Sequence, residues 1–167
     1  NFPTLTEENS IDVFELQRQE QELMRKQYEI NKNFYIYVDY NRVMFDTSPF
    51  IENGTTFVPI RMLMNALGVN DDDITYDDGV VRIKNEDTEI ELIIGNTFAK
   101  VNGEEVQLLA PPVIKEDRTY VPLRFISENL GYFVEYEQYG EEHFIYIESE
   151  DPQIYSYYDE VVYEEAI

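Results

Sequence analysis

Hydrophobic spacing predicts a helix near the N-terminus. Leu16, Leu23 and Ile30 recur every seven residues, which places them along one narrow side of a helix. We expect this helix to begin near Thr6 or Asn9, because both side chains suit an N-cap. A lone helix of such length is only marginally stable in water, so its apolar side is expected to pack on the main domain or on a partner.

The middle of the chain contains an internal repeat. Residues 38–68 and 101–131 align without a gap at an offset of 63 and share ten identities. The longest matched run is Val58-Pro59-Ile60-Arg61 in the first copy and Val121-Pro122-Leu123-Arg124 in the second. Two copies are too few for a solenoid, so we expect a pair of related α+β units. The residues that define the shared motif are Pro59, Arg61, Gly68, Pro122, Arg124 and Gly131.

Each unit has the same predicted order of elements. Two short strands open it, at residues 36–39 and 43–45 in the first copy and at 99–101 and 106–109 in the second. A Thr-aromatic-Val-Pro run then leads into a helix, where proline suits the first turn because its missing N–H costs nothing. Glycine ends each helix in a left-handed conformation that is unstrained only for glycine. A final hairpin closes the unit.

The predicted fold is therefore α+β, with two pseudo-symmetric β-hairpin–helix–β-hairpin repeats in one compact domain. This domain spans residues 34–149, as units 34–86 and 87–149, between a helical arm at 1–33 and an acidic tail at 150–167. The tail is rich in tyrosine, which favours an extended strand that pairs within its own sheet or with another subunit. Its candidate interaction residues are Tyr155, Tyr157, Tyr158 and Tyr163.

Charge and composition exclude several classes of function. The chain has 35 acidic and 12 basic side chains, a net charge of −23 and a sequence pI near 4.1. Nucleic-acid binding needs clusters of Lys and Arg, which are absent here, and anionic membrane surfaces are disfavoured for the same reason. The sequence has no cysteine, which excludes disulfides and thiol catalysis, and no apolar run of membrane-spanning length. At 43% hydrophobic residues it has enough apolar material for a core.

Candidate metal and catalytic residues are few. His143 is the only histidine, which argues against a histidine-rich metal site or a Ser-His-Asp triad and favours an ordinary strand or loop residue. The acidic cluster that includes Asp71, Asp73 and Asp77 is a candidate calcium site, although its spacing differs from an EF-hand loop and a solvated turn explains it as well. Asn53-Gly54-Thr55 fits a glycosylation sequon, but Asn-Gly also suits a tight turn.

Arg61 and Arg124 occupy the same place in the two predicted helices. They would form an anion clamp or, as a structural role, bond loop carbonyls or a neighbouring carboxylate while their stems pack on the sheet. We favour the structural role, because a repeated fold requires repeated structural residues.

The repeat resembles the copper amine oxidase N-terminal domain family, also called the stalk domain. The matching stretches are Val101-Asn102-Gly103, Pro111-Pro112-Val113-Ile114 and the run from Arg118 to Gly131, with Ile90–Gly95 fitting the run-in. The first unit is similar as a diverged copy through 53–61, so the resemblance covers about residues 34–149. It implies an exported bacterial protein in which the module is a non-catalytic spacer, stalk or interaction element. The oxidase chemistry of the family name requires three histidine ligands in a separate domain, and this chain has one histidine.

The leading hypothesis is thus a non-enzymatic, extracellular structural module of a bacterial surface, without a cofactor. The chain begins at Asn, so an export signal is expected to have been removed before it. The terminal arms would mediate assembly into a homo-oligomer or contact with another surface protein. The alternative is a module that binds a cell-wall glycan or a peptide through exposed tyrosines.

Overall fold

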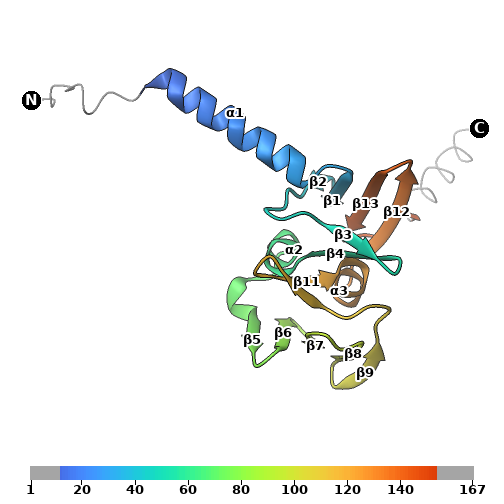
Figure 1. The fold of residues 1–167 in the computed structure, drawn as a ribbon. Coiled ribbons are helices and arrows are strands. Elements are labelled where there is room, and N and C mark those ends of the chain that lie inside the picture. The colour runs from blue at the N-terminus through green and yellow to red at the C-terminus, as the bar shows by residue number, and fades with distance from the viewer. Residues whose placement is uncertain (1–11, 154–167) are drawn as a thin grey trace, which may run out of the picture.

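The computed structural model describes residues 12–153 and contains helices and strands in mixed order, as an α+β protein (Figure 1). Predictions for the first eleven residues, Thr6 and Asn9 included, and for the tail tyrosines lie outside the described residues. The elements run as α1 (Val13–Ile30), β1 (Phe34–Val38), β2 (Asn41–Arg42), β3 (Phe50–Glu52), β4 (Thr55–Pro59), α2 (Ile60–Ala66), the 3₁₀ turn η2 (Asp71–Asp73), β5 (Ile74–Asp77), β6 (Val80–Asn85), β7 (Thr88–Ile93), β8 (Phe98–Val101), β9 (Glu104–Gln107), β10 (Val113–Lys115), β11 (Arg118–Pro122), α3 (Leu123–Asn129), β12 (Phe133–Tyr139) and β13 (Glu142–Glu148).

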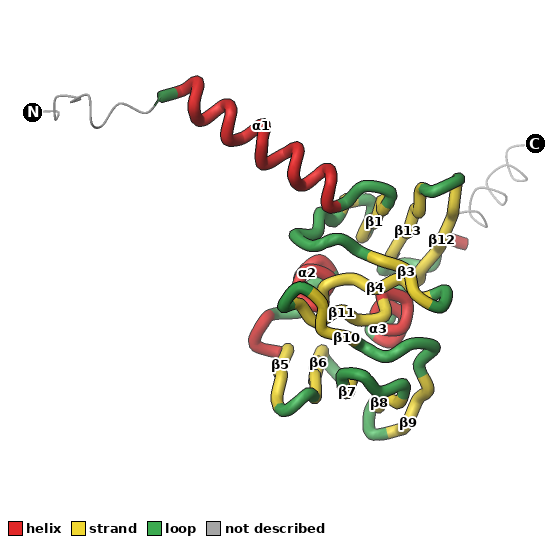
Figure 2. The backbone as a smooth tube through the Cα atoms, in the orientation of Figure 1, coloured by secondary structure: helices red, strands yellow, loops and turns green. Residues whose placement is uncertain are grey.

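Three sheets make up the domain (Figure 2). The central sheet has the strand order β10-β11-β4-β3, and its two hairpins join where β4 and β11 pair antiparallel, with Val58 opposite Val121. The second sheet has the order β5-β6-β7-β8-β9, and the third β12-β13-β1-β2. Each outer sheet therefore combines hairpins from both halves of the domain.

The third sheet brings together the two ends of the domain. Strand β1 pairs parallel with β13, from Phe34 opposite His143 to Val38 opposite Ile147. Ile36 and Ile147 are almost fully buried on the core side of this sheet. Sequence periodicity predicts both strands but not their pairing, since the two strands are separated by almost the whole domain.

The same three elements occur in both halves at a constant separation. Strand β10, strand β11 and helix α3 each begin 63 residues after β3, β4 and α2, and each has the same length as its counterpart. The helices begin directly after Pro59 and Pro122. These prolines are the N-cap residues, one position before the first helical turn in which we expected them. Gly68 and Gly131 end the helices with φ of 80° and 91°, as predicted.

The hydrogen bonds at both helix ends follow the same pattern. The Val69 N–H donates to the Met64 carbonyl and the Tyr132 N–H donates to the Ser127 carbonyl. This six-to-one bond, with the glycine in the left-handed region, is the Schellman C-cap. Both helices thus stop at the positions that the two glycines indicate.

The opening of the first half differs from the prediction. Residues 43–45 form a loop, and β2 consists of Asn41–Arg42 instead. Phe45 is nonetheless 1% exposed, and its backbone groups bond to the side chain of Asn31 rather than to a strand. In the second half the hairpin forms as expected, with Asn102 and Gly103 at the turn in the left-handed region.

Helix α1 also begins later than the expected Thr6 or Asn9. Asp12 is its N-cap, and one carboxylate oxygen accepts from the N–H groups of Phe14 and Glu15 at 3.0 and 3.3 Å. A carboxylate that accepts the unpaired N–H groups of the first turn is a stronger start signal than a favourable charge within that turn.

Candidate interaction surfaces

Helix α1 projects from the domain and is held only at its C-terminal end (Figure 1). Asn31, 1% exposed, is the residue that holds it. Its side-chain amide donates to the carbonyls of Gln27 and Phe45 at 2.9 Å each, and its side-chain oxygen accepts from the Phe45 N–H at 2.8 Å. One buried amide thereby joins the last turn of the helix to the loop after β2.

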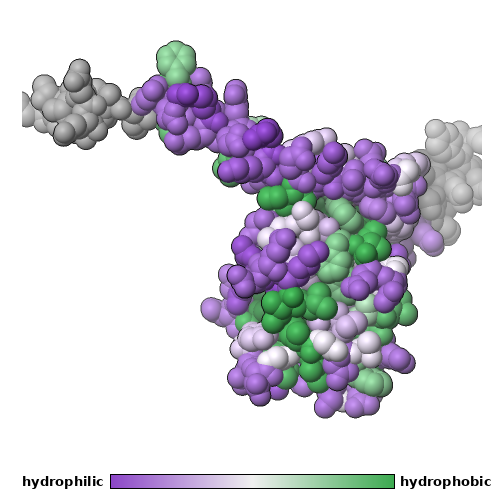
Figure 3. All heavy atoms as spheres, in the orientation of Figure 1, coloured by the Kyte–Doolittle hydropathy of each residue, from purple (hydrophilic) through white to green (hydrophobic). Residues whose placement is uncertain are grey.

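The surface of α1 is largely hydrophilic but carries exposed apolar side chains (Figure 3). No residue of the helix is buried. The predicted stripe residues Leu16 and Leu23 are 43% and 59% exposed, and only Ile30, at the base, is half-buried. Within residues 12–153, Leu16 and Leu23 therefore do not pack on the domain.

One acid interrupts the stripe of α1. Glu20 lies four residues after Leu16 and three before Leu23, so the three side chains share one side of the helix. Glu15 and Glu22 each pair with an arginine on the same helix. Among residues 12–153, Glu20 has no ion pair within 4 Å.

A groove of about 740 Å³ opens on the domain surface. Four segments form it, namely the β3–β4 hairpin, the end of β9, the start of α3 and the inner sides of β12 and β13. Most of its lining is apolar, from the buried Ile145 to Leu109, which is 82% exposed. The other apolar side chains that line it include Ile51, Pro122, Leu123, Phe125 and Val134.

Polar side chains also line the groove, and its charged groups are paired. Arg124 Nη1 lies 3.3 Å from Glu128 Oε1, and the Tyr136 hydroxyl contacts His143 Nδ1. The His143 ring also stacks on Phe34 with centroids 5.1 Å apart. His143 thus lies at the start of strand β13, as predicted, and its ring contacts two aromatic neighbours.

Arg61, the counterpart of Arg124, is in a different environment. Its Nη1 lies 3.4 Å from Asp71 Oδ1 in an exposed ion pair, and it does not line the groove. Both arginines therefore pair with a neighbouring carboxylate, which is part of the structural role that we expected. Their side chains are 55% and 57% exposed, so neither forms a desolvated anion clamp.

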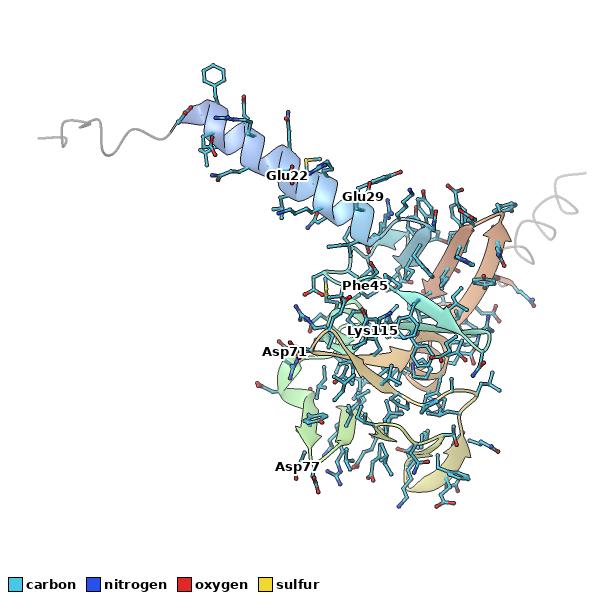
Figure 4. All side chains as sticks on the ribbon, viewed as in Figure 1. Glu22, Glu29, Phe45, Asp71, Asp77 and Lys115 are labelled. Carbon is cyan, nitrogen blue, oxygen red and sulfur yellow. The ribbon has the colours of Figure 1, made fainter. Side chains whose placement is uncertain are left out.

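The candidate calcium residues are not brought together. Asp71 and Asp77 lie at opposite ends of the segment formed by η2 and β5 (Figure 4). Within the part of the chain that the structure describes, no group of three or more carboxylate, histidine or cysteine side chains is arranged to hold a metal ion. The spacing of the acids in the sequence did not reveal that Asp73 belongs to a 3₁₀ turn. Asp77 lies at the end of the extended strand that follows, which separates the two side chains.

The candidate sequon Asn53-Gly54-Thr55 lies at a tight turn. Asn53 and Gly54 form the β3–β4 turn, at φ of 50° and 72°.

Aromatic residues form rows on the outer side of the third sheet. The Tyr35 ring lies between the Arg42 guanidinium, 4.6 Å from its centroid, and the Phe144 ring, 4.7 Å away. Tyr139 meets Phe144 edge-on from the next strand at 5.8 Å. The Tyr35 ring is therefore covered by two neighbours, whereas Tyr139 is 63% exposed. Acids surround them, and the Glu142 carboxylate, followed by burial, raises the pKa of Tyr35.

Sequence reasoning missed Asn31 and this aromatic face. Alternation in Phe34–Val38 and Glu142–Glu148 was a usable signal, since tyrosine and phenylalanine alternate there with isoleucine and valine. Asn31 gave only the ordinary signal of a polar residue after a helix. Its role depends on Phe45, which lies 14 residues later.

Comparison with known proteins gives one family match. No curated protein matches the chain. Within residues 12–153, no helix combines the length and apolar character that crossing a membrane requires. The family model for the copper amine oxidase N-terminal domain matches residues 37–145, which is more than half of the chain. In copper amine oxidases this N-terminal domain is a non-catalytic, stalk-type domain. The chain therefore belongs to the copper amine oxidase N-terminal domain family.

Proposed function

We propose that this protein is a non-enzymatic interaction module of an exported bacterial surface protein, and that helix α1 joins it to a partner. The observation that carries the proposal is α1 itself, an 18-residue helix with no buried side chain that is nevertheless clamped to the domain by Asn31. A helix held in this way presents a defined surface at a fixed place. The non-catalytic character of the family supports the same conclusion.

The physical chemistry of α1 favours a bound state. An isolated helix of this length is marginally stable in water, and most helices in proteins gain their stability from packing an apolar side. Burial of exposed apolar side chains stabilises an interface by roughly 25 cal/mol per Å². The helix has four acids and three bases, so it is nearly neutral in a chain of net charge −23. Contact through α1 therefore meets less charge repulsion than contact elsewhere.

The conserved motif of the two units serves the scaffold in this proposal. Pro59 and Gly68 in the first half, and Pro122 and Gly131 in the second, bound helices of equal length. We propose that the two halves form a pseudo-symmetric pair about the β4–β11 contact. The constant separation of 63 residues between their elements supports this proposal.

Glycan binding through tyrosine is the weaker alternative. Sugar stacking needs an open ring face. Both faces of the Tyr35 ring are covered, by Arg42 and Phe144, and the exposed rings of Tyr40, Tyr76 and Tyr139 belong to three different strands or turns rather than to one stacked platform. The tail tyrosines Tyr155, Tyr157, Tyr158 and Tyr163 lie outside the described residues. Pull-down with cell-wall polysaccharide tests this alternative directly.

Light scattering of the full chain over a range of concentrations tests the proposal. We expect the chain to associate, and the double variant Leu16→Asp/Leu23→Asp to stay at the 19.8 kDa mass of one chain. The control is Gln17→Asp/Gln21→Asp, which adds the same charge on another side of the helix. A wild-type chain that remains monomeric and has no protein partner would contradict the proposal.

A further inference from the structure

The groove on the domain matches the chemistry of the exposed side of α1. The stripe of Leu16, Leu23 and Ile30 on α1 is apolar, as is much of the groove lining, and each surface also carries a charge of suitable sign. On α1 this is Glu20, which lies between Leu16 and Leu23 and has no ion pair in the described part of the chain. On the groove wall it is Arg124, whose only ion pair there is an exposed one with Glu128. An exposed pair within one helix contributes little, so Arg124 is available to a second carboxylate.

A helix cannot reach the groove of its own chain. An 18-residue helix is about 27 Å long. It is clamped at Asn31 and points away from the domain (Figure 1). The stripe and the groove of one molecule are therefore held apart. Any contact between these two surfaces is made by two molecules.

We infer that α1 of one copy docks in the groove of a second copy, with Leu16 and Leu23 against its apolar lining and Glu20 paired with Arg124. This inference rests on the proposed function, and it names the partner and the receiving surface. An amphipathic helix in an apolar groove is a common mode of protein recognition. Because donor and acceptor surfaces differ, each copy can donate and receive, which produces a head-to-tail chain or a closed ring.

Charge distinguishes this arrangement from pairing of α1 with α1. In a helix pair that buries the stripe, Glu20 of each copy enters an apolar seam. A polar residue at such a position lowers the stability of the pair. In the groove the same carboxylate lies beside Arg124. The residues that face the contact are also nearly neutral in sum, with Arg124, Glu128 and His143 as the ionisable side chains of the groove lining.

A complementation experiment with full chains tests the inference. The donor variant is Leu16→Asp/Leu23→Asp, and the acceptor variant is Leu109→Asp/Arg124→Glu. All four side chains are at least 43% exposed, so both variants are expected to fold, which circular dichroism and thermal melting verify. Each variant alone should remain monomeric. An equimolar mixture should form a particle of twice the 19.8 kDa mass and nothing larger, since only one working contact exists.

A charge exchange tests the predicted ion pair. Glu20→Arg and Arg124→Glu should each weaken association roughly tenfold or more, because like charges then face each other. The two changes in one chain should restore association to within about threefold of wild type. Arg61→Glu is the matched control, because Arg61 is the counterpart of Arg124 but lies outside the groove.

The outcomes separate the inference from the proposed function. If the acceptor variant alone associates like wild type, or the mixture stays monomeric while wild type associates, the groove does not receive α1 and the inference fails alone. If association survives the donor variant, α1 is not the contact and both fail. A wild-type chain that is monomeric at every concentration overturns the inference. It overturns the proposed function as well only if no other protein binds through α1, for example if the chain binds polysaccharide alone.

Discussion

The Asn31 side chain makes three hydrogen bonds to backbone groups at a buried position. It bonds both backbone groups of Phe45 and the last turn of α1, at a site that water does not reach. A buried amide whose hydrogen bonds are all made stabilises the fold. If the amide is removed, the buried backbone groups that it bonded are left unpaired, and this costs free energy. Attachment of the arm therefore depends on one residue.

Asn31→Ala should lower the free energy of unfolding by about 2–4 kcal/mol, because the buried N–H and carbonyl of Phe45 lose their partner. The matched control is Asn129→Ala, since Asn129 donates only to the Phe125 carbonyl, at 2.7 Å on the same helix. Chemical denaturation measures both. An equal, small loss in the two variants would show that the clamp is not a stabilising contact.

A turn of the second half lacks the glycine of its counterpart. Glu116 and Asp117 have φ of 52° and 59°, where the first half has Asn53 and Gly54 at 50° and 72°. Left-handed backbone is strained for residues other than glycine and, to a lesser degree, asparagine and aspartate. The β10–β11 turn therefore retains strain that the β3–β4 turn avoids.

Asp117→Gly should raise the free energy of unfolding by about 0.5–1 kcal/mol, because glycine relieves this strain. The reciprocal change Gly54→Ala should lower it by about 1 kcal/mol. An added Cβ at Gly54 has no neighbour within 4 Å, so the loss reports backbone strain alone. Thermal melting measures both changes, and shifts of the same sign in the two variants would contradict the explanation.

At the scale of elements, the third sheet concentrates negative charge. Glu148 on β13 is partly buried, and burial, followed by the charges of Glu135 and Asp39, raises its pKa. A carboxyl group whose pKa is higher in the folded state binds protons more readily when folded. Folding is therefore favoured by this group at low pH, and the benefit is lost as the pH rises through the folded pKa.

Glu148→Gln should raise the melting temperature at pH 7, because the neutral amide has no charge to desolvate or to repel. The difference from wild type should shrink as the pH falls and vanish below the ordinary carboxyl pKa of 4.5. Melting curves between pH 3 and 7 check this. The control is Glu52→Gln, which removes one negative charge at an exposed position of β3. A difference that grows toward low pH would reverse the sign and refute the argument.

At the scale of the whole molecule, charge opposes association. The chain carries a net charge of −23, and residues 34–149 contain 22 acids against eight bases. Repulsion between such molecules acts over roughly 10 Å at 0.1 M salt and over longer distances at lower salt. The near-neutral α1 and groove are the surfaces where contact costs least.

Association should therefore strengthen as sodium chloride rises from low to physiological concentration, because screening of the overall repulsion outweighs screening of one Glu20–Arg124 pair. Light scattering at fixed protein concentration measures this. A parallel series in calcium chloride at the same ionic strength separates general screening from calcium binding at the candidate residues Asp71, Asp73 and Asp77. Dissociation by salt would show that attraction between charges dominates the interface.

Sequence patterns located much of the domain correctly. The α2 and α3 helices, their glycine ends and the Asn102–Gly103 hairpin all follow from local signals. The strand that we predicted at residues 43–45 is wrong for a physical reason. These residues form a loop, and Phe45 is buried in it because its backbone groups bond to the side chain of Asn31. Local patterns contain no information on distant neighbours.

The sequence by itself determined the α+β class, the two helices that end at Gly68 and Gly131, and the family, because turn glycines, prolines and periodicity act over a few residues. Only the tertiary structure decided that β1 pairs with β13, that Asn31 clamps the arm and that four separate segments line one groove. These contacts join residues far apart in the chain, and their energies depend on burial. Burial is a property of the packed molecule and not of any local stretch of sequence.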